Sequence, residues 1–123
     1  MNYVAISIGA ILGANARFIL GGWVVDRLGA AFPYGTLLIN VTGSFLLGLV
    51  LAVVSQRADA PLWLRTGLAV GLIGSYTTFS TFGAETYGLL NAGSFVAAGV
   101  NILASVAGSL VAVYLGMQLG RLV

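Results

Sequence analysis

The sequence predicts an all-α membrane protein with four transmembrane helices, of which the third is broken near its middle. Hydrophobic residues make up 59% of the 123 residues and charged residues only 7%, whereas a soluble domain carries about a quarter charged residues. Four apolar stretches are each long enough to span a bilayer as a helix. The third is interrupted by a run of small, hydroxyl and aromatic residues.

One transmembrane domain is expected over residues 1–123, with spans at about 3–25, 34–54, 62–90 and 94–119. Helices are expected because an open strand would leave its backbone groups unpaired in lipid. Pro33 and Pro61 each lie just before a span, where proline suits a helix start. The connector 91–93 is so short that the last two spans should form a tight hairpin.

The composition excludes several functions. The chain has no cysteine and no histidine, which removes thiolate chemistry, histidine acid–base catalysis and the common zinc sites. Its net charge of +2 is too small to suggest nucleic acid as a partner.

Pairs of small residues recur at four-residue spacing: Gly9/Gly13, Ser44/Gly48, Gly67/Gly71, Ala104/Gly108 and Gly116/Gly120. Such pairs let helix backbones approach closely. We expect about half of them to pack within one subunit and the rest to face another subunit.

The distribution of arginines gives only a weak preference for one orientation in the membrane. With four spans, both termini lie on one side, together with Arg57, Arg65 and Arg121, while Arg27 lies on the other. The positive-inside rule places the termini in the cytoplasm by a small margin, which is compatible with insertion both ways round. Because both halves of the chain share one orientation, inverted symmetry would have to come from an antiparallel dimer.

The third span carries the strongest signals of function. Gly71, Gly74 and Ser75 should loosen the helix, and residues 76–78 lower its helix propensity further. A break at membrane depth frees backbone groups, which must be buried, line water or hold an ion. A simple glycine kink is the alternative.

Phe79 and Phe82 follow the break on one helix face, interleaved with Thr78, Ser80 and Thr81. Hydroxyls donate hydrogen bonds without a charge, and a phenyl ring has a positive edge. This set could therefore pass a small anion without trapping it. The alternative is two core- or lipid-facing rings beside hydroxyls that cap a helix.

Other polar residues lie within the spans. The amide of Asn40 must find a partner there, and Asn101, Ser105 and Ser109 share one face of the fourth span, so hydrogen bonding between helices is the simplest role for all of them. Arg17, inside the first span, could bond freed carbonyls, attract anions or extend to the interface.

Three segments together resemble the Fluc (CrcB) fluoride channels. Residues 35–48, GTLLINVTGSFLLG, resemble their second-helix signature, residues 77–82, TTFSTF, look like their third-helix signature, and residues 13–18, GANARF, are similar to their first-helix pattern. The TTFSTF segment is very specific, and the likeness covers essentially the whole chain. Two departures are Ser75, where the family often has a second glycine, and Gly83, where it often has serine.

The resemblance implies an antiparallel, dual-topology homodimer in the cell inner (plasma) membrane, which exports fluoride passively through two pores without an enzymatic step. It also implies a structural sodium ion (Na⁺) at the dimer centre, held by the backbone carbonyls of Gly74 and Thr77. Arg17 and Glu85 are expected to have vestibule or structural roles. The implied pore residues are Asn40, Phe79, Phe82, Ser80 and Thr81, extended by Thr36 and Ser109.

Two other functions are weighed against a channel. A small multidrug or cation antiporter is also a four-helix, dual-topology protein, but it needs a carboxylate inside the first span, where this chain has Arg17. A membrane scaffold that transports nothing needs no row of polar residues along two helices.

Overall fold

The computed structural model describes residues 1–57 and 59–123, which fold into helices joined by short connectors. Three helices are long and apolar enough to cross a membrane: α1 (Asn2–Leu28), α2 (Tyr34–Ser55) and α6 (Phe95–Gly120). Pro33 and Pro61 immediately precede helices, as expected. The remaining segment consists of α3 (Leu62–Thr66), the π-helix η1 (Gly67–Ile73), α4 (Gly74–Tyr76) and α5 (Phe79–Asn91).

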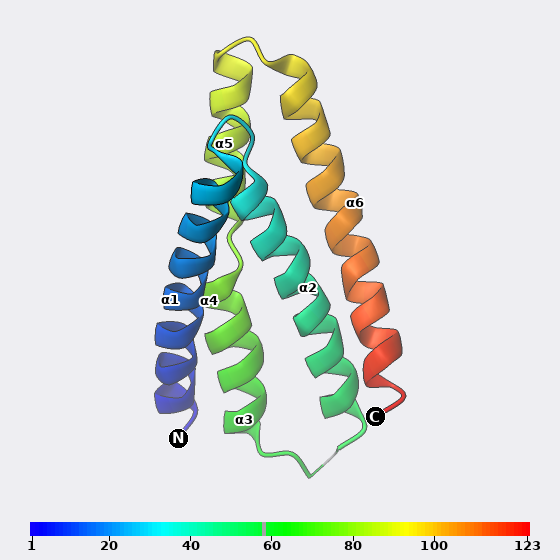
Figure 1. Cartoon of the computed structure of the whole chain (residues 1–123). Coiled ribbons are helices and arrows are strands. Elements are labelled where there is room, and N and C mark those ends of the chain that lie inside the picture. The colour runs from blue at the N-terminus through cyan, green and yellow to red at the C-terminus, as the bar shows by residue number, and fades with distance from the viewer. Residues whose placement is uncertain (58) are drawn as a thin grey trace.

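The chain runs up and down four times, and both termini lie at the same end (Figure 1). These four passes fit the four expected spans. The last two passes form the tight hairpin that was expected. Gly93 adopts a positive φ of 78° in the connector, and the Ser94 N–H donates to the Leu89 carbonyl at 2.8 Å.

The third pass is broken within the segment that the sequence indicated, at the C-terminal end of residues 71–78. Gly71 lies within the π-helix η1, and Gly74 keeps helical dihedral angles (φ −62°, ψ −33°). The backbone becomes extended only at Thr77 (ψ 159°) and Thr78 (φ −153°, ψ 114°). The glycines therefore widen the helix without ending it, and two β-branched residues form the break itself.

Glycines allow close packing between neighbouring passes. A Cβ on Gly13 would overlap the Leu72 carbonyl, and one on Gly116 would overlap the Phe45 carbonyl. At all eight glycines in the four-residue pairs an added Cβ would lie within 3.2 Å of another residue of the chain, although at Gly67 and Gly108 the nearest atom belongs to a side chain. These glycines therefore pack within the chain, and the expectation that about half of the pairs face another subunit stays a prediction.

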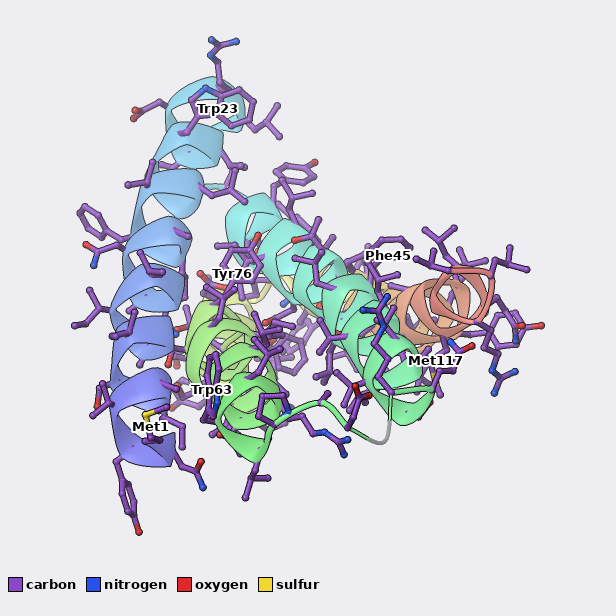
Figure 2. All side chains as sticks on the ribbon, turned by 90° about the horizontal axis from the view of Figure 1, so that it is seen from below. Met1, Trp23, Phe45, Trp63, Tyr76 and Met117 are labelled. Carbon is purple, nitrogen blue, oxygen red and sulfur yellow. The ribbon has the colours of Figure 1, made fainter. Side chains whose placement is uncertain are left out.

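The helices form an open row and not a closed bundle. Seen from the end, α1 and α6 lie at opposite sides of the molecule, with α2 and the third pass between them (Figure 2). Only 11% of the most apolar window of α1 is buried, and 22% of those in α2 and α6. Much apolar surface is thus left for lipid or for another chain.

Candidate functional site

Asn40 of α2 holds the break in the third pass. Its Nδ2 donates to the Thr78 carbonyl at 2.9 Å, and its Oδ1 accepts from the Thr78 N–H at 2.8 Å. In an unbroken helix that N–H would donate to the carbonyl of Gly74. The amide of Asn40 thus satisfies both backbone groups of Thr78 and releases the Gly74 carbonyl from its usual partner.

Thr77 is held from the other side by α1. Arg17 Nη1 donates to the Thr77 carbonyl at 3.3 Å, and the Thr77 hydroxyl donates to the Ile73 carbonyl at 3.1 Å. Gly43 of α2 lies against this bend, and a Cβ there would overlap the methyl group of Thr77. Of the roles considered for Arg17, the structure shows a bond to a carbonyl at the break.

Thr78 also starts α5. Its hydroxyl accepts from the Thr81 N–H at 3.3 Å and donates to the Thr81 hydroxyl at 2.9 Å, and the Ser80 hydroxyl lies 3.5 Å away. This is an N-cap, as in the alternative considered for these hydroxyls. The positive end of the α5 dipole therefore lies inside the third pass, beside Phe79.

Phe79 and Phe82 contribute to a pocket of about 370 Å³ beside the break. Their ring centroids are 5.5 Å apart and the rings are tilted by 39°. Phe79 is 83% exposed, so its ring projects from this chain. The pocket is lined by Asn40, Gly43, Ser44, Leu47, Thr77, Thr78, Phe79, Phe82, Ser105, Val106, Ser109 and Leu110.

The structure brings together only some of the expected pore residues. Asn40, Phe79, Phe82 and Ser109 share the pocket. Among the described residues, Thr36, Ser80 and Thr81 are not part of its lining. Ser80 and Thr81 lie in the first turn of α5.

Thr36 forms a separate polar contact with Glu85. The Thr36 hydroxyl donates to Glu85 Oε1 at 2.9 Å. The buried Oε2 atom has no hydrogen-bond partner within the described part of the chain. The expected residues therefore form two groups, one around the break and one further along α5.

Three polar pocket residues, Ser44, Thr78 and Ser105, were not among the expected site residues. Ser44 lies four residues after Asn40, and Ser105 lies four residues before Ser109, so each shares a helix face with a residue that was expected. Helical spacing could have identified both. Ser105 also donates to Asn101 Oδ1 at 3.4 Å, and the buried Asn101 donates to the Thr86 hydroxyl at 2.9 Å. Asn101 thus joins α5 to α6, as expected.

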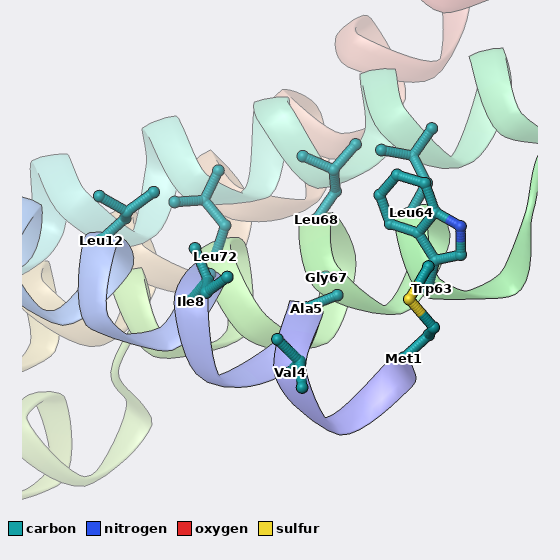
Figure 3. A pocket seen from close by; sticks show the side chains of 11 residues that line it. Met1, Val4, Ala5, Ile8, Leu12, Trp63, Leu64, Gly67, Leu68 and Leu72 are labelled. Carbon is teal, nitrogen blue, oxygen red and sulfur yellow. The ribbon is translucent and has the colours of Figure 1, made fainter.

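A second pocket, of about 460 Å³, lies between the start of α1 and α3–η1 (Figure 3). Its lining is apolar, from Met1 and Val4 to Trp63 and Leu72. Its lining side chains, all within the described residues, carry no charge and no hydroxyl or amide group. The pocket beside the break, which has amide and hydroxyl groups, is therefore the candidate functional site.

Fold and site together define a multi-pass integral membrane protein with a broken helix beside an uncharged polar pocket. Residues 4–117 match the family described as "CrcB-like protein, Camphor Resistance (CrcB)". The chain belongs to this family.

Similar proteins include three that are each named "Fluoride-specific ion channel FluC". The protein of Roseiflexus sp. (strain RS-1) is 44% identical, that of Geobacter metallireducens 46% and that of Syntrophotalea carbinolica 48%. Each match covers 98% of this chain and 98% of the relative. The relatives and this chain therefore correspond over nearly their full lengths.

Substituting Asn40→Ala should destabilise the protein by about 2–4 kcal/mol, because two buried backbone groups lose their partners. Asn15→Ala is the matched control, since Asn15 is exposed and its amide donates to the Ile11 carbonyl one turn back in α1, and it should cost less than about 0.5 kcal/mol. Unfolding of both variants in detergent would be followed by circular dichroism. Equal losses in the two variants would contradict the role given to Asn40.

Proposed function

We propose that this protein is a fluoride-selective channel that passively exports fluoride from the cytoplasm. The main support is the pocket beside the break, in which amide, hydroxyl and phenyl groups gather without a charged side chain, in a chain with full-length FluC relatives. A weak acid such as HF crosses membranes uncharged and ionises at a higher internal pH. A passive anion path then allows fluoride to leave the cell.

The pocket chemistry suits a small, strongly hydrated anion. Asn40 Nδ2 carries two protons, and its bond to Thr78 uses one. The second proton is available to an anion, as are the hydroxyls of Ser44 and Ser109. The rings of Phe79 and Phe82 can present their positive edges. None of these groups holds a fixed charge, so bound fluoride can leave again.

Fluoride efflux from liposomes tests this function directly. Purified protein should release fluoride and retain chloride, with each ion followed by a selective electrode. A folded, reconstituted protein that releases neither ion would favour a scaffold. Exchange of protons for an organic cation would favour an antiporter.

The functional unit we propose is an antiparallel homodimer with two pores. Supporting this are the open row of helices, the low burial of α1, α2 and α6, and the exposed ring of Phe79. A second copy inserted the other way round would cover this surface and supply the inverted symmetry that one chain lacks. The same exposed face of the chain would then form both the pores and the contact between the two copies.

Replacing Phe79 or Phe82 by isoleucine should lower fluoride efflux per dimer by roughly tenfold, because the favourable ring edge is lost while bulk is kept. Light scattering in detergent should still give the mass of two chains for each variant. Phe95→Ile is the control, since Phe95 is an exposed ring at the start of α6. Unchanged efflux in both pore variants would refute the role of the rings, and a one-chain mass for the wild type would refute the dimer.

A structural sodium ion at the dimer centre is also part of the proposal. The two expected carbonyl ligands, those of Gly74 and Thr77, differ in how available they are to such an ion. The carbonyl of Gly74 is released from Thr78, and Gly74 is exposed. The carbonyl of Thr77 already accepts a bond from Arg17, although a long one of 3.3 Å, and an oxygen with two lone pairs can accept a second partner. Carbonyl oxygens are suitable ligands for a hard cation.

Exchanging sodium for the large organic cation N-methyl-D-glucamine, throughout purification and assay, should lower fluoride efflux and weaken the dimer. Adding sodium back should restore both. Efflux and dimer mass that do not depend on the cation would contradict the sodium site while leaving the channel function intact.

A further inference from the structure

Tyr76, the last residue of α4, plays no part in the proposed pore, yet it contacts α2 directly. Its hydroxyl lies 2.8 Å from the hydroxyl of Thr42. The Thr42 hydroxyl has one proton, which it directs to the Leu38 carbonyl at 2.7 Å. Donation from the Tyr76 O–H to the Thr42 hydroxyl gives both protons an acceptor, and it links Tyr76 through Thr42 to the α2 backbone.

The apolar surroundings of Tyr76 increase the free-energy cost of losing this bond. Its side chain borders an apolar cavity of about 340 Å³ whose other lining residues are Ala16, Leu20, Leu46, Leu72 and Ile73. No other polar side chain is part of that lining within the described residues. A phenol O–H without a partner in such surroundings is costly. Thr42 removes this cost and fixes the direction of the ring.

With this bond, three successive residues of the third pass, 76–78, are each hydrogen-bonded to α1 or α2. Thr78 is held by Asn40, and Thr77 by Arg17. Three residues after Asn40, Gly43 packs against the bend, and a Cβ there would approach both the Tyr76 ring and the Thr77 methyl group. Residues 40–43 of α2 thus contact the break both through its backbone and through the Tyr76 ring.

We propose that Tyr76 and Thr42 form a positioning pair, which fixes the end of α4 and so sets where the extended backbone at Thr77 and Thr78 begins. The pair acts on backbone geometry and does not contact the permeating ion. It rests on the proposed function only in treating the break as part of a pore.

Local amide hydrogen exchange, read by mass spectrometry in detergent, tests this pair. Tyr76→Phe and Thr42→Val should each raise exchange in peptides covering residues 76–81 by roughly threefold, the average effect of a polar contact between membrane helices. Either substitution removes the same bond between Tyr76 and Thr42, and the bond from Thr42 to Leu38 lies within α2. At residues 76–81 the double variant should therefore also show roughly threefold and not ninefold. Thr42→Ser, which retains the hydroxyl, should behave like the wild type.

Two controls separate positioning from general destabilisation. Tyr114→Phe removes a phenol from an exposed site on α6 and should leave exchange at the break unchanged. Peptides covering residues 110–119 should exchange equally in all variants. Unchanged exchange in Tyr76→Phe, or effects that multiply in the double variant, would overturn the proposal. No flux is measured, so this result is independent of whether the protein conducts fluoride.

Discussion

The two hydrogen bonds between Asn40 and Thr78 are the interaction on which the rest of the site depends. A helix interrupted inside a bilayer must find new partners for its backbone, because lipid offers none. One amide side chain supplies both a donor and an acceptor, and so satisfies the N–H and C=O of a single residue. Without it, the N–H and C=O of Thr78 would both lose the partners that they have at the break.

Several features follow from keeping the helix open. The start of α5 is brought inside the third pass, with its positive dipole end beside Phe79. The Gly74 carbonyl is released, which makes it a candidate ligand for a cation. The same side chain that holds the break also lines the polar pocket. In this chain, therefore, one residue links the backbone geometry to the chemistry of the proposed ion path.

Much of this could be predicted from the sequence, because bilayer length and polarity constrain it strongly. The positions of the four passes follow from apolar length and from Pro33 and Pro61. The partner of Asn40 could not be predicted, since helix periodicity does not say which residue of another helix an amide will meet. The break was expected over residues 71–78, but the sequence did not show that Gly71 would lie in the wider turns of η1 while the extended backbone is confined to Thr77 and Thr78.

The small residues illustrate a similar limit. Their spacing indicated close helix contacts, but not whether the neighbour would belong to the same chain. The carbonyls of Leu72 and Phe45 facing Gly13 and Gly116 settle this locally. Likewise, Thr81 of α5 and Thr36 of α2 were both expected among the pore residues, but Thr81 bonds to the Thr78 cap while Thr36 pairs with Glu85. These differences are matters of rotation about a helix, which sequence spacing alone does not fix.

The central claim is that Asn40 replaces the helical partners of Thr78. Site-resolved amide exchange of the wild-type protein, measured by NMR in detergent, tests it most directly. The account predicts that the Thr78 N–H is protected as strongly as amides in the middle of α2, although it lies outside any helix. Exchange of Thr78 as fast as that of the exposed residues at the chain termini would contradict the account.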